Sequence, residues 1–298
     1  MLKKIDKSAQ YLAQNIDLLR CPLCHSAFHL DHYALICDKR HTYNLSKKGV
    51  VNFLTIKPDT THYTRKMFEP RRKLIQAGMY APVLQEIQTL LTPGNLLDVG
   101  SGEGSFLDLL DVSDHKFGFD IALDGVNMAT DLTDLQAFFS LSDLTNLPFA
   151  DQSMATVLNI FTPSNYREFD RVLGHGGQVI KVIPDRYYLQ ELRTAFGLPV
   201  DYDNRDVLGK FAENFPDFTQ KESHYEFDLP EQLRQDFLSM SPLEWRISEA
   251  EKLEIAKNPP KKATIHVQIL QGYKSWHKLL CQGFYCPLSW KRLQWRCK

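Results

Sequence analysis

Short apolar segments alternate with amphipathic segments through the middle of the chain. The apolar segments have the length of strands, and they predict strands at residues 95–100, 116–120, 137–142, 155–161 and 177–184. Between them, apolar positions recur at helical spacing and predict helices at 104–111, 122–130, 164–174 and 187–196. Strands that alternate with helices form a parallel sheet with helices on both faces, so the pattern predicts an α/β domain.

Further elements are predicted on either side of this core. A loosely helical pattern covers residues 1–19, and a longer one runs from Arg65 to Leu91 with a break near Gly78. A helix is expected at 230–239, and two more strands, which bring the total to seven, at 224–229 and 263–270.

Composition changes along the chain and suggests its domains. The stretch 57–64 is polar and contains Pro, which indicates a linker. Residues beyond 272 hold three of the four Trp residues and six Lys or Arg. We therefore predict an N-terminal domain at 1–60, an α/β domain at 61–272 and a basic aromatic tail of unknown role at 273–298.

The overall composition excludes several classes of protein. A chain of 298 residues with 43% hydrophobic and 24% charged residues is typical of globular proteins. No apolar run is long enough for a membrane helix, and the N-terminus lacks the apolar core of a signal peptide, so we expect a cytoplasmic protein. Six Cys residues are too few for a disulfide scaffold in a chain of this length.

The formal net charge of -1 hides a strong asymmetry. Residues 1–73 hold 14 Lys or Arg against 6 Asp or Glu, whereas residues 74–272 hold 15 against 30. A basic front end on an acidic body is typical of a protein whose front end binds a polyanion. A solvated charged surface without a partner is the alternative interpretation.

Three of the Cys residues lie close together in two short pairs with a His. The pairs have the form C-x2-C and C-x3-H, with twelve residues between them, and each lets one tight turn provide two zinc ligands. Three thiolates and one imidazole complete a tetrahedral shell, which predicts a structural zinc site at Cys21, Cys24, Cys37 and His41. His25, His29 and His32 lie between the pairs but form no second short pair with Cys37.

A glycine-rich turn follows the first predicted strand of the α/β domain. Glycines there let the backbone approach a ligand at the carboxyl end of the strand. The turn departs from the dinucleotide fingerprint because Ser105 stands where a third glycine is expected. Its form, Asp98-x-Gly100-x-Gly102-x-Gly104, resembles motif I of S-adenosylmethionine-dependent methyltransferases.

Polar residues end the next strands as well. Asp120 could accept hydrogen bonds from both ribose hydroxyls, and Asp143, followed by Leu144, stands where related enzymes bind adenine. Each acid alone is more often a cap or turn residue, but three at the ends of three successive strands favour a shared ligand. Asn159, which ends the fourth strand, could orient a planar base, although a polar strand end before a helix is nearly as plausible an interpretation.

The combination of these motifs closely resembles the 23S ribosomal RNA guanine-N1 methyltransferases of the RlmA/TlrB type. The resemblance covers about residues 18–272 and rests on the Cys/His pairs followed by LSKKGVVNFL, RRKLIQAGMYAPV, LLDVGSGEGSF and NIFTPSNYREFDRVL. It implies a Rossmann-like class I methyltransferase fold with a seven-stranded, mostly parallel sheet. It also implies a 23S RNA hairpin as substrate, a homodimer, Zn2+ and S-adenosylmethionine, with the latter bound by Tyr80, Asp98, Gly100, Gly102, Glu103, Gly104, Ser105, Phe106, Asp120, Asp143 and Leu144.

Basic residues next to the metal site agree with an RNA substrate. Lys39, Arg40, Lys47 and Lys48 surround the Cys/His pairs, and further cations stud the helix that leads into the α/β domain, namely Arg65, Lys66, Arg71, Arg72 and Lys73. Two departures from the family remain. Residues 196–207 lack a His that some relatives use, and the tail after Tyr273 matches nothing in the family.

Two other functions stay open at this point. One is a methyltransferase of a small molecule in which the metal site is mere scaffold. The other is a zinc-ribbon nucleic-acid-binding protein with a vestigial cofactor site. The pattern identifies neither the general base nor the guanine that is modified, and it does not say whether modification confers macrolide resistance.

Overall fold

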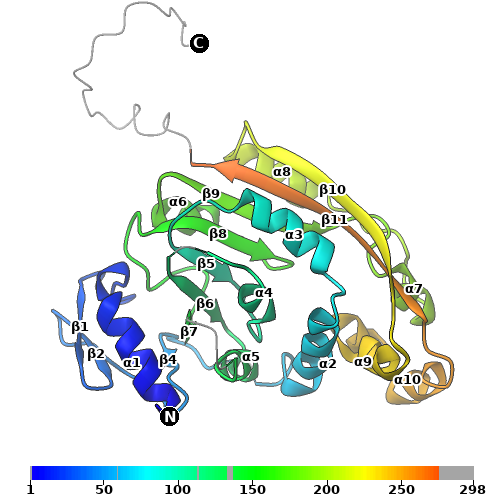
Figure 1. Ribbon diagram of the computed structural model, residues 1–298, viewed down its shortest axis with the longest axis horizontal. Coiled ribbons are helices and arrows are strands. Elements are labelled where there is room, and N and C mark those ends of the chain that lie inside the picture. Colours follow the sequence, from blue (N-terminus) through cyan, green and yellow to red (C-terminus); the bar gives the residue numbers. More distant parts are fainter. Residues whose placement is uncertain (1, 59, 113, 133–136, 275–298) are drawn as a thin grey trace, which may run out of the picture.

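The computed structural model describes residues 2–58, 60–112, 114–132 and 137–274. One large mixed sheet crosses the molecule in the order β10-β11-β9-β8-β5-β6-β7-β4 (Figure 1). Neighbouring strands from β4 to β9 are parallel, whereas β11 and β10 are antiparallel to their neighbours. The strands are β4 (Val51–Asn52), β5 (Leu96–Val99), β6 (Lys116–Asp120), β7 (Ala137–Leu141), β8 (Met154–Ile160), β9 (Leu173–Pro184), β10 (Thr219–Asp228) and β11 (Lys262–Tyr273).

This sheet confirms the predicted mostly parallel α/β fold. All seven predicted strands are present, and β4 adds an eighth that was expected only as part of the metal-binding domain. The chain runs outward from β5 to β6 and β7 on one side, then returns to β8 and β9 on the other. In doubly wound sheets, ligands bind at the carboxyl ends of the strands where this reversal occurs, here between β5 and β8.

Helices cover both faces of the sheet, as the buried side chains show. On one face, α2 (Arg65–Gln76), α3 (Ala81–Leu90), α5 (Leu123–Ala129), α7 (Gln190–Ala195) and α9 (Arg234–Ser239) pack against Leu96, Leu158 and Ile180. On the other, α1 (Lys4–Gln14), α6 (Tyr166–Val172) and α8 (Arg205–Asn214) pack against Leu97, Phe117 and Val179. Alternate residues of each strand therefore serve different layers of the core, which accounts for continuous apolar runs in the sequence.

Some boundaries differ from the predicted ones. The long helical pattern forms two helices, because Gly78 adopts a φ of 93° and the amide of Met79 bonds back to the carbonyl of Leu74, which ends α2. The helix after the glycine turn, α4 (Ser105–Asp108), is short, and α8 and α10 (Glu249–Ile255) were not predicted. The predicted tail lies outside the described residues except for Tyr273 and Lys274.

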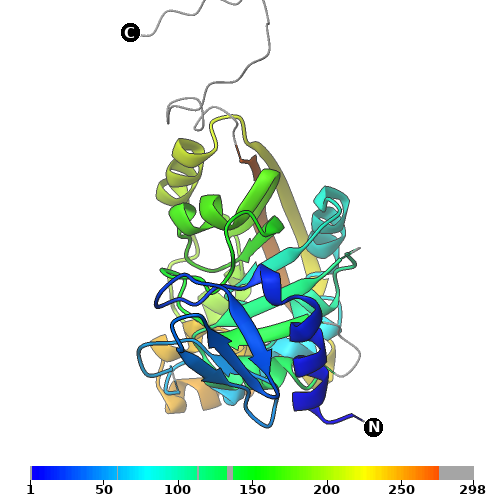
Figure 2. The same cartoon turned by 90° about the vertical axis from the view of Figure 1, so that its left-hand side faces the viewer.

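The N-terminal segment forms a small separate sheet of three antiparallel strands. These are β1 (Phe28–Asp31), β2 (Ala34–Cys37) and β3 (Thr42–Asn44), preceded by α1 and the short helix η1 (Ile16–Leu18). Figure 2 shows the small sheet and α1 at the end of the molecule where β4 joins the large sheet. β4 pairs with β7, so the predicted N-terminal domain contributes a strand to the large sheet. The predicted domain boundary at residue 60 stays a prediction.

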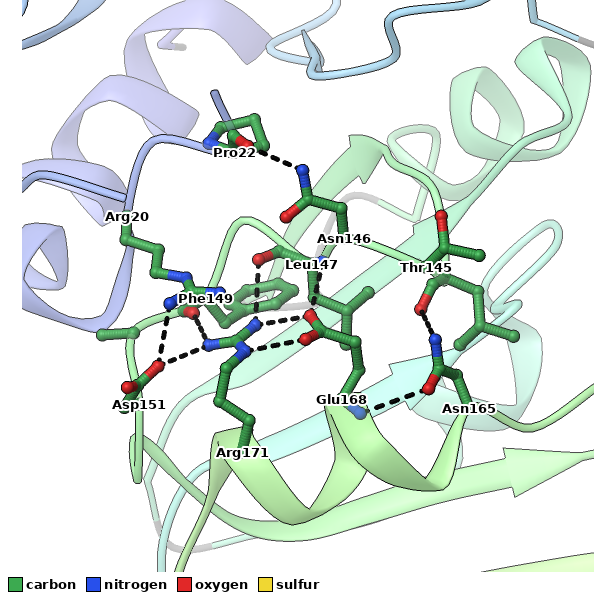
Figure 3. Close-up of polar contacts among 12 residues, drawn as sticks. Arg20, Pro22, Thr145, Asn146, Leu147, Phe149, Asp151, Asn165, Glu168 and Arg171 are labelled. Atoms are coloured by element: carbon green, nitrogen blue, oxygen red, sulfur yellow. Dashed lines mark hydrogen bonds and ion pairs between the residues drawn. The ribbon is translucent and has the colours of Figure 1, made fainter. Parts of the chain in front are cut away.

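Arg171 on α6 is the centre of the junction between the two parts (Figure 3). Its guanidinium donates to both carboxylate oxygens of Glu168, at 2.9 and 2.7 Å, and to Asp151 at 2.9 Å. It also donates to the carbonyl oxygens of Leu147 and Phe149. A single side chain thus holds the segment that follows β7 against α6, and an arginine fork with this many acceptors is well suited to the task.

The N-terminal segment attaches to this same loop. Arg20 donates to Asp151 at 3.0 Å, and the side-chain amide of Asn146 donates to the carbonyl oxygen of Pro22 at 2.6 Å (Figure 3). Pro22 follows Cys21, one of the predicted metal ligands. The loop between β7 and β8 is therefore tied both to the N-terminal segment and to α6.

None of the helices that the structure describes is long and apolar enough to cross a bilayer.

Candidate cofactor cavity and metal-binding cluster

The glycine-rich turn lies tightly between two neighbouring segments. Gly100 has a φ of 68°, and a Cβ there would lie 2.5 Å from the side chain of Thr162. Gly102 has a φ of 53°, and a Cβ there would lie 2.9 Å from the ring of Phe68. Both positions require glycine for conformation and for space. The amide of Gly102 donates to the Asp120 carboxylate at 2.9 Å, so the turn and the end of β6 support each other.

A cavity of about 750 Å³ opens beside this turn, at the carboxyl ends of the strands. Its volume falls in the range of small-molecule sites. Six predicted cofactor-binding residues line it, namely Tyr80, Gly100, Gly102, Asp120, Asp143 and Leu144. Five others lie behind the wall, and these are Asp98, Glu103, Gly104, Ser105 and Phe106.

Asp98 is a buried acid whose second oxygen, Oδ2, has no hydrogen-bond partner within the described part of the chain. Burial, reinforced by the charges of Asp120 and Glu103, raises its pKa to about 7, and Arg71 opposes the rise. Burial also raises the pKa of Asp120, against hydrogen bonds from the amides of Ala122 and Gly102. Two crowded acids whose pKa values stay raised beside a single cation, Arg71, are typical of a ligand-binding site.

Glu103 is buried as well, but one of its carboxylate oxygens, Oε2, has two hydrogen-bond partners. It accepts from the guanidinium of Arg72 at 2.7 Å and from the hydroxyl of Ser105 at 2.6 Å. Arg72 also donates to the carbonyl oxygens of Glu103 and Met128, at 2.6 and 2.9 Å. Through Arg72, the predicted residues Glu103 and Ser105 therefore connect the glycine turn to α2 and α5.

Aromatic side chains form one wall of the cavity. The hydroxyl groups of Tyr80 and Tyr188 lie 2.7 Å apart, and Phe106 packs edge-on against the Tyr80 ring at 5.4 Å. Phe161, with a positive φ of 56°, completes the group. Burial raises the pKa of both tyrosines, so their hydroxyls remain protonated. Of this wall, Tyr188 was not predicted, because nothing in its local sequence separates it from core residues.

Asn159 does not face the cavity. Its side-chain amide donates to the Thr162 hydroxyl at 2.5 Å and to the carbonyl of Pro163 at 2.9 Å, and its oxygen accepts from Lys181 and from Ser164. Burial lowers the pKa of Lys181 to about 8. The pair thus fixes the loop that lines the cavity after β8, and a catalytic role for Asn159 stays a prediction.

Another part of the cavity wall, beside Phe68, is aromatic and partly exposed. It is lined by Tyr63, Arg193, Tyr202, Trp245 and Arg246. Trp245 is 44% exposed, and its ring meets the Tyr63 ring edge-on at 5.2 Å. Exposed large aromatics at the mouth of a cavity are unusual enough to indicate binding. The sequence pattern missed Arg193, Tyr202, Trp245 and Arg246, since they come from segments without a motif.

The four predicted metal ligands come together in the N-terminal segment. Their ligand atoms all lie within 4.8 Å of one another. The sulfurs of Cys24 and Cys37 are 3.5 Å apart, and the His41 Nδ1 lies 3.4 Å from the sulfurs of Cys21 and Cys37. A tetrahedral zinc ion requires about 3.8 Å between sulfurs and about 3.5 Å between sulfur and nitrogen, so the four residues fit this ion.

A second group of metal-ligand types, which the sequence did not suggest, consists of Glu222, His224 and His266 on β10 and β11. The two nitrogens of His266 are already engaged there. Nδ1 accepts from the amide of Tyr187 at 3.2 Å, and Nε2 lies 3.0 Å from a Glu222 oxygen. With its ring satisfied by these partners, His266 is better understood as a structural residue that stacks against the rings of Tyr187 and His224.

The cations of α2 differ in their partners: three form ion pairs within the molecule and one lines the cavity. Arg65 pairs with Glu69, Arg72 with Glu103 and Lys73 with Asp236. Three of the five cations expected to bind phosphates are therefore neutralised within the molecule. Arg71 lines the cavity, with its guanidinium over the Phe106 ring.

Comparison with known proteins matches the chain to a family model and to curated relatives. Residues 19–59 match the family model of the RlmA N-terminal zinc ribbon. The Bacillus subtilis (strain 168) protein YxjB, assigned as a 23S rRNA (guanine-N(1)-)-methyltransferase, is 34% identical over 280 residues, which cover 87% of this chain and 98% of YxjB. A 23S rRNA (guanine(748)-N(1))-methyltransferase of Streptomyces fradiae is 29% identical over 72% of this chain and 78% of its own length.

Proposed function

We infer the roles of these residues from one premise, namely that the chain belongs to the RlmA family of 23S rRNA (guanine-N1)-methyltransferases. Enzymes of this family transfer the methyl group of S-adenosylmethionine to N1 of a guanine in 23S rRNA. The sequence had left open a small-molecule methyltransferase and a binding protein with a vestigial site. Likeness to rRNA methyltransferases over most of the chain decides against both.

We propose that the donor lies along the carboxyl ends of β5, β6 and β7. When bound, it supplies a methyl group activated by a sulfonium. The backbone at Gly100 and Gly102 lies against its methionine part, Asp120 accepts from the ribose hydroxyls, and Asp143 with Leu144 holds the adenine. The observation that carries this assignment is that one cavity is lined by residues that follow β5, β6 and β7, which are neighbours in the sheet. Tyr80 closes the methionine end.

The remaining cofactor-site residues act from behind the wall. Glu103 and Ser105 hold the turn through Arg72, and Phe106 supports Tyr80. Gly104 lets the chain enter α4 with a φ of 85°. Asp98 provides negative charge beneath the turn, where the amino group of the donor's methionine part is expected.

We propose that the target guanine binds at the aromatic part of the cavity wall that Tyr63, Tyr202 and Trp245 form. Trp245 and Tyr63 are placed to stack on a base that has left its strand. Guanine N1 carries a proton that must leave, and negative charge then develops on O6. The guanidinium groups of Arg193 and Arg246 line this part of the wall and can stabilise that charge. Asn159 and Lys181 contribute by holding the loop at Thr162 and Pro163.

The N-terminal segment is proposed to bind zinc through Cys21, Cys24, Cys37 and His41 and to recognise an RNA hairpin. Its four protein ligands leave no open position, so the ion has a structural role. Lys39, Arg40 and Lys47 are exposed beside it and can contact phosphates. A homodimer and a cytoplasmic location, which the family resemblance and the rRNA substrate imply, belong to this proposal; light scattering of the purified protein tests the dimer.

Methyl transfer to unmodified RNA tests the proposed function. Purified protein is incubated with 23S RNA that lacks N1-methylguanine and with labelled S-adenosylmethionine, and the product is mapped by mass spectrometry. We expect label at N1 of one guanine. Asp120→Asn should weaken donor binding about tenfold or more, whereas Asp217→Asn, at an exposed turn outside the cavity, should not. Protein that binds the donor but leaves the RNA unlabelled would contradict the proposal.

A further inference from the structure

We propose that Arg71 binds the carboxylate of the donor's methionine part and thereby determines the direction in which the donor lies in the cavity. This inference rests on the proposed function. It adds a binding residue that neither the glycine turn nor the acids at the strand ends indicate.

The position of Arg71 supports this role. It extends from α2 into the cavity wall, with the guanidinium carbon 5.4 Å from the centre of the Phe106 ring. Phe106 lies directly after the glycine turn and packs on Tyr80, so Arg71 is at the methionine end. A guanidinium that contacts an aromatic ring in this way still has N–H groups available for an anion.

Arg71 differs from its neighbours on α2 in its partners. Arg65, Arg72 and Lys73 each form an ion pair with a carboxylate, at 3.2, 2.7 and 2.9 Å. In the part of the chain that the structure describes, Arg71 forms no such pair, although it is half-buried. A half-buried guanidinium without an anion is costly, and a ligand anion in the cavity would relieve that cost.

The charges around Arg71 indicate what kind of anion fits. Arg71 lowers the pKa of Asp98 and of Asp120, so both acids lie within reach of its field. One cation beside two crowded acids is complementary to a ligand end that carries a carboxylate and an ammonium together. The donor has one anionic group, its carboxylate, and two cationic centres, which Arg71 repels. The carboxylate must therefore lie next to Arg71 and the adenosine must point toward Asp120 and Asp143.

A donor analogue that lacks the carboxylate tests this pairing directly. Calorimetry gives the dissociation constants of S-adenosylmethionine and decarboxylated S-adenosylmethionine for the wild-type protein and for Arg71→Met and Arg71→Lys. The wild type should prefer the carboxylate form by on the order of tenfold to a hundredfold. In Arg71→Met this preference should fall to within about threefold, and Arg71→Lys should retain part of it, because its charge remains without the fork.

The control variant is Lys66→Met, which removes an exposed cation from the same helix and should keep the wild-type preference. Thermal unfolding verifies that each variant is folded. If Arg71→Met keeps the full preference for S-adenosylmethionine over its decarboxylated form, the inference is overturned. If RNA binding alone weakens in that variant, the inference is also overturned and Arg71 is assigned to the RNA. Wild-type protein that binds neither ligand would instead contradict the proposed function.

Discussion

Two buried acids of the glycine turn show how differently one residue type can be used. Glu103 accepts from Arg72 and Ser105 and so satisfies its charge inside the fold. Asp98 leaves Oδ2 without a partner in the described chain and has a pKa of about 7. The first acid stabilises the turn, whereas the second lowers stability until a cation is bound near it.

Asp98→Asn is expected to make the unliganded protein more stable at pH 8. The folded pKa of Asp98 lies above its unfolded value of 3.8, so the unfolded state loses its proton first as the pH rises. Stability is therefore lost between about pH 4 and 7, by up to about 4 kcal/mol from this group. Urea unfolding at pH 5 and pH 8 should show a smaller decrease in the variant. An equal decrease in both proteins would exclude Asp98 as the cause.

Arg72→Met should be strongly destabilising. It would leave the buried Glu103 carboxylate without its cation, a change that typically costs about 3–5 kcal/mol. Lys73→Met on the same helix breaks the more exposed pair with Asp236 and should cost about 1 kcal/mol or less. Urea unfolding of the two variants gives both values. Equal costs would mean that Glu103 finds another partner or becomes protonated.

Sequence patterns predict elements where the elements follow from local composition. The central strands are buried on both faces and read as apolar runs, and the Cys/His pairs and the glycine turn carry their own signals. Strand β4 has two residues and exists because the edge of β7 is available to Val51 and Asn52, which no local pattern reveals. Tyr188, Trp245 and Arg71 reach the cavity only through the tertiary arrangement of α2 and the later segments.

Asn146→Ala should weaken donor binding from a distance. The Asn146 amide ties the loop that begins at Asp143 and Leu144 to the carbonyl of Pro22, next to a metal ligand. Without this bond the adenine side of the cavity is less ordered, and we expect a dissociation constant about two- to tenfold higher at unchanged zinc content. Calorimetry and elemental analysis measure the two quantities. Asn214→Ala, whose amide bonds to the carbonyl of Lys210 within α8, is the matched control.

From the distribution of charge over the described residues, we expect RNA phosphates to contact the N-terminal segment. Because three cations of α2 are paired internally, the exposed residues Lys39, Arg40 and Lys47 remain as phosphate contacts. Each contact adds close to one unit to the slope of log binding constant against log salt. Lys47→Met should therefore reduce that slope by about one, measured by fluorescence anisotropy with a hairpin RNA. Lys257→Met, in an exposed pair with Glu254, should leave it unchanged.

Removal of zinc should loosen one edge of the large sheet and spare the other. The metal-binding segment continues through β3 into β4, which pairs with β7 at Val51 and Ser140. Chelation should speed hydrogen exchange in β4 and β7, while the β10–β11 hairpin keeps its protection. Exchange mass spectrometry resolves these peptides. Unchanged protection in β7 would show that β4 stays in place without the ion.

The pairing of β4 with β7 also affects how the chain folds during synthesis. Val51 leaves the ribosome long before its partner Ser140, so the nascent chain carries an unpaired strand while α2, α3 and the first two core strands are made. During that interval, the neighbouring Cys and His residues can capture their ion and give the emerging chain an ordered end. Once β7 has been made, β4 can pair with it and cover the edge of the sheet, which would otherwise be open to pairing with another chain.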